Sequence, residues 1–123
     1  MRTAAQLVGS SAEDGVAGHL RQLGWIVLGR NVHVGRAEID ILAIDPKRPR
    51  TLVAVEVRWR SRRDFGLAEE TVDRLKLARL RAATLTLREG AVLTGLQIPR
   101  LPIRVDVIAV EPGGVLRHHR HVG

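Results

Sequence analysis

Acidic residues interrupt two apolar stretches of the sequence that otherwise read as β-strands. Glu38 and Asp40 lie within EIDILAI (38–44), and Glu56 lies within LVAVEVRWR (52–60). Both stretches are rich in Val, Ile and Leu, as strands are. A half-buried carboxylate loses hydration, and a second carboxylate beside it raises the pKa of at least one of the two. Bound Mg²⁺ or Mn²⁺ would relieve this conflict, because hard divalent ions prefer carboxylate oxygens.

We expect the two stretches to pair as an antiparallel hairpin. A symmetric register through the proline-containing turn sets Ile44 opposite Leu52 and brings Asp40 opposite Glu56. Opposed residues have Cβ atoms roughly 4.5–5.5 Å apart, so the two carboxylates would share one pocket. The spacing therefore predicts a metal site at Asp40 and Glu56.

A purely structural interpretation fits the same spacing. In this register Glu38 faces Arg58, and the two could form an ordinary cross-strand ion pair. Asp40 could then lie at an exposed end of the sheet. The residues alone leave the metal site and the structural interpretation open.

The elements around this hairpin predict a single α/β domain with a mixed central sheet flanked by helices, in the order α-β-β-β-α-β-β. Ser10 or Ser11 is expected to cap the first helix, with acids in its first turn and Gly24 just past its end. The first strand is expected to be irregular near Gly29. The expected elements are helices over 10–24 and 68–88, strands over 25–34, 38–44, 52–60 and 103–110, and a weak final strand within a polar tail over 112–123, so that the core spans about 10–111.

The positive charge of the chain indicates a polyanionic partner. Its formal net charge is +7 and its sequence pI is about 11.5, which favours nucleic acid first and an anionic membrane second. The densest basic block, RWRSRR, contains a tryptophan and is compatible with phosphate contacts and base stacking. A solvated basic face, or a module for an acidic protein partner, fits the same charges. The candidate nucleic-acid-binding residues are Arg36, Arg58, Trp59, Arg60, Arg62 and Arg63.

Composition excludes several other classes of function. The 123 residues contain no cysteine, which excludes disulfides, thiol catalysis and Cys-ligated zinc. No apolar run approaches the roughly 18 residues of a membrane span, and the N-terminal apolar run is too short for a signal peptide. We therefore expect a cytoplasmic protein without a membrane partner. The C-terminal HHRH (118–121) is expected to be a flexible polar tail, although it could bind a transition metal.

The order of the acids also resembles a known nuclease signature. An Asp in one strand, followed by Glu-x-Lys in the next, is the core of the PD-(D/E)XK superfamily, and Asp40 followed by Glu56-Val57-Arg58 resembles it. More narrowly, the chain resembles the YraN-like family of small bacterial endonuclease-like proteins over most of residues 12–110. The matching stretches are AEDGVAGHLRQLGWIVLGRN, AEIDILAID, VAVEVRWRSRRDFG, VDRLKLARL and IRVDVIAV.

This resemblance implies a restriction-endonuclease-like three-layer fold and metal-dependent cleavage of phosphodiester bonds in DNA or RNA. Asp40 and Glu56 would ligate Mg²⁺ with water and the scissile phosphate. Glu13, which matches an acid on the family's first helix, could complete the metal shell or could simply stabilise the helix N-terminus. Glu38 would have a supporting role, such as orienting Arg58. Many related nucleases pair, so a homodimer is a further expectation.

Arg58 departs from the signature, which normally has lysine at this position. Arginine stays charged, so it can stabilise a phosphate but cannot readily act as a general base. A nucleic-acid-binding protein with weakened chemistry is therefore the alternative function. Lys76, in VDRLKLARL, could supply the missing group if its helix packs over the acids; otherwise it is a surface lysine. Two smaller departures are Ala37 in place of a glycine and Gly15 in place of an apolar residue.

Overall fold

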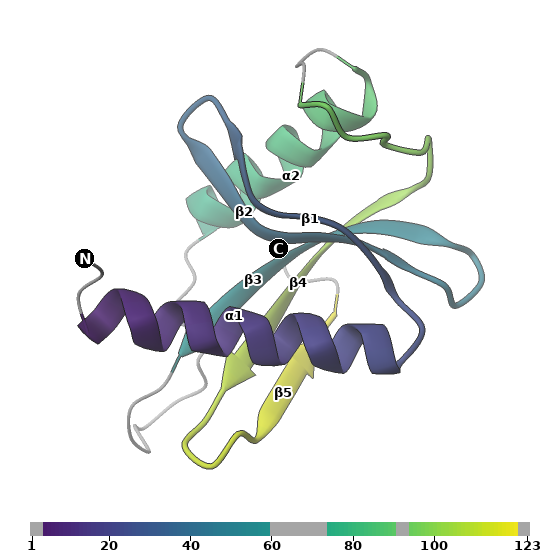
Figure 1. Ribbon diagram of the computed structural model, residues 1–123. Coiled ribbons are helices and arrows are strands. Elements are labelled where there is room, and N and C mark those ends of the chain that lie inside the picture. The colour runs from purple at the N-terminus through teal and green to yellow at the C-terminus, as the bar shows by residue number, and fades with distance from the viewer. Residues whose placement is uncertain (1–3, 60–73, 91–93, 121–123) are drawn as a thin grey trace.

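The computed structural model describes residues 4–59, 74–90 and 94–120. Five strands form one mixed sheet in the order β1-β2-β3-β4-β5, in which only β3 and β4 run parallel within the described residues (Figure 1). The predicted order of elements and the mixed α/β architecture are therefore confirmed. The elements are α1 (Ala4–Gln22), β1 (Ile26–Val34), β2 (Ala37–Asp45), β3 (Thr51–Trp59), α2 (Arg74–Arg88), β4 (Ile103–Val110) and β5 (Leu116–His119).

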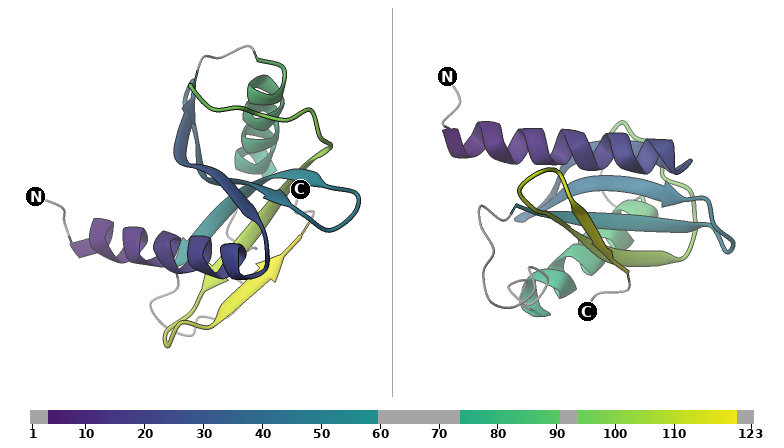
Figure 2. Two further views of the ribbon diagram at one scale, coloured as in Figure 1. Left: turned by 45° about the vertical axis from the view of Figure 1, so that its right-hand side comes forward. Right: turned by 90° about the horizontal axis from the view of Figure 1, so that it is seen from below.

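The two helices cover opposite faces of the sheet, which gives three layers (Figure 2). Each helix turns a stripe of apolar residues with helical spacing toward the sheet, and the alternating side chains of the central strands fill both interfaces. On the α2 side, Leu77, Leu80, Ala83 and Leu87 pack with Leu42, Leu52, Ala54, Val105 and Val107. On the α1 side, Ala12, Val16, Ala17 and Leu20 pack with Ile41, Ala43, Val53, Val55 and Ile108.

Helix α1 begins earlier than the sequence predicts. It starts at Ala4, so Ser10 and Ser11 lie inside the helix and not at its N-cap position, and the acids that follow them are not in its first turn. The preceding residues AAQLV include good helix formers, which extend the helix through the weaker serines. The predicted end is right: Gly24 has a φ of +86°, and Trp25 N–H donates to Leu20 O, which together form a Schellman cap.

Strand β1 is irregular where the sequence predicts. Its register with β2 shifts by one residue between Val27 and Gly29, which is a β-bulge. A side chain at Gly29 would have its Cβ 3.0 Å from Leu96 and 3.1 Å from Val32, so only glycine fits without displacing these neighbours.

The C-terminal prediction is wrong in part. His118 and His119 belong to β5, which pairs with β4, and are not part of a flexible tail. Pairing with the inner strand β4, not the local composition, orders this segment. The predicted start of the second helix, over 68–73, lies outside the described residues. Neither helix in the described part of the chain has the length and apolar character needed to cross a membrane.

Candidate functional site

Strands β2 and β3 pair along only part of their length. Their ladder has the predicted register, with Ile44 opposite Leu52, but it stops at the pair Ile41 and Val55. Beyond that pair the strands separate, and α2 covers this side of the sheet (Figure 1). We call the opening between residues 37–40 of β2 and 56–59 of β3 the fork. The predicted backbone pairing of the two acids is therefore not formed.

Asp40 bridges the fork with its side chain. Its Oδ2 atom accepts a hydrogen bond from the backbone N–H of Val57 at 2.9 Å. A carboxylate thus replaces the backbone carbonyl that a continued ladder would have offered to this donor. The acid holds the two strands together at the point where their backbones part.

The alternation of side chains along β2 changes at Asp40. Ile39 packs in the core cluster under α2, whereas Ile41 packs in the cluster under α1. Strict alternation, which the sequence pattern alone indicates, would put these two residues on one face and Glu38, Asp40 and Leu42 on the other, and the structure departs from it. A strand that leaves its neighbour is free to twist further, so Asp40 is directed toward β3 instead of toward either helix.

Glu56 is the more deeply buried of the two acids. Its residue is 4% exposed, and it lies on the face of β3 that α2 covers. Lys76 Nζ of α2 lies 2.8 Å from Glu56 Oε1. Glu56 Oε2 is buried and has no hydrogen-bond partner among the described residues. The structure thus places Lys76 in contact with Glu56, as expected if its helix packs over the acids, and not as an isolated surface lysine.

The surroundings of Asp40 disfavour its ionised form. Burial raises the pKa of Asp40 to about 7, and the neighbouring charge of Glu56 adds to this rise. The Val57 N–H and the Lys76 ammonium oppose the rise without overcoming it. At neutral pH the Asp40 carboxyl group is therefore close to half protonated, and a cation would stabilise its ionised form.

Glu13 and Glu38 form an outer acidic group beside the fork. The side-chain nitrogen of Asn31, in the amide orientation that satisfies both its ends, donates to Glu38 Oε1 at 2.9 Å and to Glu13 Oε1 at 3.2 Å. Arg30 Nη2 lies 3.6 Å from Glu13 Oε1. Burial raises the pKa of Glu13, which Arg30 opposes. Arg30 and Asn31 were not predicted as part of this group. The sequence signal was an asparagine within an expected strand, and the structure gives Asn31 a φ of +51°.

A divalent metal ion fits the donor set of the fork. Glu56 Oε2 has no hydrogen-bond partner among the described residues, and the raised pKa of Asp40 shows that its negative charge is not fully stabilised, so both acids have capacity left for a cation. Among the described residues, no group of three or more His, Asp or Glu side chains is gathered as a ready-made metal shell. Glu13 is instead held by Arg30 and Asn31, and its role as a ligand stays a prediction.

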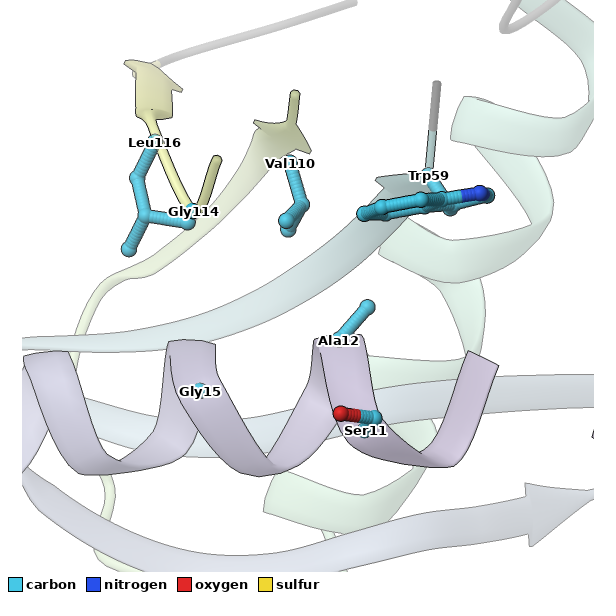
Figure 3. Close-up of a pocket in the computed structure, with 7 residues that line it drawn as sticks. All are labelled: Ser11, Ala12, Gly15, Trp59, Val110, Gly114 and Leu116. Carbon is cyan, nitrogen blue, oxygen red and sulfur yellow. The ribbon is translucent and has the colours of Figure 1, made fainter. Parts of the chain in front are cut away.

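The predicted nucleic-acid-binding residues are divided among several places. Arg58 follows Glu56 on the same face of β3 by alternation, whereas Trp59 lies on the opposite face, above α1 (Figure 3). Arg36 is exposed in the turn between β1 and β2. Arg60, Arg62 and Arg63 lie outside the described residues.

A second charged cluster, buried under α1, was not predicted as a unit. Arg104 donates to both Asp106 oxygens at 2.7 and 2.8 Å and to Asp45 Oδ2 at 2.9 Å. His118 Nε2 lies 2.8 Å from Asp106 Oδ2, and Arg104 lies 5.8 Å from the centre of the Trp25 ring. We call these residues the arginine cluster. The acid inside the apolar strand IRVDVIAV was its sequence signal.

The chain is similar to a group of bacterial proteins. The family model of the uncharacterised protein family UPF0102 matches residues 12–110. A UPF0102 protein of Cupriavidus necator is 41% identical over 88% of this chain and 76% of its own length. A UPF0102 protein of Sphingopyxis alaskensis is 35% identical over 98% of this chain and 96% of its own. One of Pseudarthrobacter chlorophenolicus is 38% identical over 90% of this chain and 78% of its own.

Proposed function

The chain belongs to the UPF0102 family, also called the YraN family, and we propose that it is a Mg²⁺- or Mn²⁺-dependent nuclease that hydrolyses phosphodiester bonds of nucleic acid at the fork. One observation carries the proposal. Half-buried Asp40 and buried Glu56 lie where β2 and β3 diverge, Glu56 raises the pKa of Asp40, and Glu56 Oε2 lacks a hydrogen-bond partner among the described residues although Lys76 contacts Oε1. Such a charge imbalance costs stability unless a ligand corrects it, which is typical of a functional site.

Asp40 and Glu56 would hold the metal ion. When bound, the ion would polarise a phosphate oxygen and make water at neutral pH a better nucleophile. Asp40 must give up its proton for this role, so its raised pKa makes metal affinity depend on pH. The hydrogen bond from Val57 fixes the direction of the Asp40 carboxylate, and the contact with Lys76 fixes that of Glu56.

Lys76 is proposed to serve where the superfamily has its strand lysine. Its Nζ atom already lies at hydrogen-bond distance from Glu56, and its side chain is 42% exposed, so a phosphate can reach it. The ammonium can neutralise charge that develops on the phosphate in the transition state. Arg58, two residues after Glu56, would add a planar guanidinium for a phosphate oxygen. The change from lysine to Arg58 therefore need not remove activity.

The experiment is a cleavage screen with purified protein on linear duplex, branched and single-stranded DNA and RNA, with Mg²⁺ or Mn²⁺. Product formation that requires the divalent ion is expected with at least one substrate. Asp40→Asn and Glu56→Gln should each reduce the rate at least about a hundredfold, because each removes a metal ligand. Glu89→Gln, on an exposed ion pair with Arg100, is the matched control and should leave the rate unchanged.

A second readout does not depend on activity. Mg²⁺ or Mn²⁺ should raise the thermal midpoint of the native chain and of Glu89→Gln, but not that of Asp40→Asn. Absence of metal-dependent cleavage on every substrate, together with unchanged thermal midpoints, would refute the proposal. Metal-independent binding that weakens linearly with the logarithm of salt concentration would then support the alternative of a nucleic-acid-binding protein.

A further inference from the structure

Trp59, the last residue of β3, has a large aromatic ring that is partly exposed to solvent. The residue is 43% exposed, whereas the other tryptophan, Trp25, is 5% exposed. The Trp59 ring lies over α1, on the face of β3 opposite to Glu56 (Figure 3). Exposed aromatic surface of this size gains free energy when a planar apolar group covers it.

A pocket of about 380 Å³ lies beside this ring. Figure 3 shows the Trp59 ring edge-on above α1, with the methyl group of Ala12 pointing toward it and Gly15 farther along the same helix. A Cβ at Gly15 would meet nothing within 4 Å, so the pocket is open because α1 carries no side chain there. Its other lining residues are Ser11, Val110, Gly114 and Leu116. This size is within the range of ligand pockets.

The pocket and the fork lie along the same stretch of β3. Glu56 and Trp59 are three residues apart, which is about 10 Å along a strand. From Glu56 onward β3 no longer pairs with β2, so this strand edge is not covered by its neighbour in the sheet. A polynucleotide with a phosphate at the fork could pass this edge and present a neighbouring base to the Trp59 ring.

We propose that the pocket between Trp59 and α1 binds one unstacked nucleobase of the nucleic-acid substrate. The inference rests on the proposed function, because the fork supplies the phosphate site of the same strand. Stacking on an aromatic ring accepts any base, and the net charge of +7 favours a polyanion over a neutral apolar peptide. A base must leave its stack to enter, so single-stranded or frayed nucleotides should bind more tightly than a continuous duplex.

The test fills the pocket without touching the fork. Gly15→Leu places a side chain where the structure has open space. Gly18→Leu is the matched control, because Gly18 lies on the same helix, would also have nothing within 4 Å of an added Cβ, and does not line the pocket. Both changes favour the helix, so both variants should fold. In fluorescence anisotropy with a labelled single-stranded oligonucleotide in EDTA, Gly15→Leu should weaken binding about tenfold and Gly18→Leu should not.

Tryptophan fluorescence identifies the group that occupies the pocket. An oligonucleotide with bases should quench the emission of the native chain, and the same backbone with abasic positions should not, because it offers no ring to stack. Trp59→Leu should abolish the quenching, since Trp25 is buried. Equal quenching by the abasic strand, or equal affinities of Gly15→Leu and Gly18→Leu, would overturn the proposal.

Failure of the pocket and failure of the nuclease function give different results. If Asp40→Asn removes cleavage but keeps base-dependent quenching, both proposals stand. If cleavage occurs but Gly15→Leu binds as tightly as Gly18→Leu, the base pocket is wrong and the nuclease function stands. If no substrate is cleaved while base-dependent quenching persists, the nuclease function is wrong and the base pocket is supported.

Discussion

The fork and the arginine cluster both remove acidic side chains from water, and the pKa values of these acids shift in opposite directions. In the arginine cluster, burial alone would raise the pKa of Asp106, but hydrogen bonds from His118 and Arg104 outweigh it and hold that pKa below its ordinary value. In the fork, burial and Glu56 together raise the pKa of Asp40 to about 7. The chain's own side chains stabilise the ionised form of Asp106, whereas the groups around Asp40 do not offset the effect of its burial.

This difference separates structural charge from functional charge. The Asp106 carboxylate is fully buried and takes three hydrogen bonds, from Arg104 and His118, so both of its oxygens have partners within the chain. Glu56 is almost as buried, yet one of its oxygens lacks a partner among the described residues. Two acids of similar burial therefore differ in the hydrogen-bonding capacity that they leave for a metal or a substrate.

The largest expected effect is on stability, in the arginine cluster. Arg104→Met should lower the free energy of unfolding by about 3–5 kcal/mol, because it leaves Asp45 and Asp106 buried without their cation. Urea denaturation measures the change. Arg100→Met, whose side chain is 74% exposed, is the control and should stay within about 0.5 kcal/mol of the native chain. A small loss for Arg104→Met would mean that the cluster is not structural.

Asp40→Asn, in contrast, should raise the free energy of unfolding at alkaline pH. The pKa of Asp40 is about 7 in the folded chain and about 3.9 in an unfolded one, so the folded state binds the extra proton between these values. Stability is therefore lost as the pH rises from about 4 to 7 and stays lower above 7. The amide oxygen of Asn can still accept the Val57 N–H.

We expect Asp40→Asn to be more stable than the native chain by about 1–3 kcal/mol at pH 8, with the gain shrinking steadily toward pH 4. Urea denaturation across this pH range, without divalent ions, measures it. Glu89→Gln should show no such pH-dependent gain, because its exposed carboxylate lies outside the fork. A loss of stability in Asp40→Asn at pH 8 would contradict the comparison between the two clusters.

Lys76→Met should act on the acids more than on the fold. The ammonium opposes the rise in the pKa of Asp40, so its removal should move that pKa above 7, as followed by carboxyl NMR titration. The stability change should be about 1 kcal/mol or less, because the side chain is 42% exposed and its ion pair is screened. Arg74→Met, exposed at the start of the same helix, should leave the Asp40 titration unchanged.

The smallest expected effect on the stability of the fold belongs to the outer acids, whose removal should be seen in the titration of Asp40. Glu13→Gln removes a charge that raises the pKa of Asp40, but this contribution ranks below those of burial and Glu56. The same NMR titration should show a slight decrease in the Asp40 pKa. Asp14→Asn, on the neighbouring and more exposed acid, should produce none. An equal decrease with Asp14→Asn, or no decrease with Glu13→Gln, would contradict the influence of Glu13 on the Asp40 pKa.

The sequence by itself determined the order of elements, the hairpin register and the irregularity near Gly29, because local apolar periodicity and turn residues carry these features. It also indicated Asp40 and Glu56, because acids inside apolar strands conflict with burial. The start of α1 was missed because helix propensity in the preceding residues extended it past the serines.

Only the tertiary structure decided how the charges are compensated. The separation of β2 from β3 turns Asp40 toward Val57, and the packing of α2 brings Lys76 to Glu56. The pairing of β5 with β4 likewise delivers His118 to Asp106. These partners are 12 to 20 positions apart in the chain, and no local pattern sets their approach. The pKa of an ionisable group depends on its burial and on its neighbours, and both are set by the packing of strands and helices.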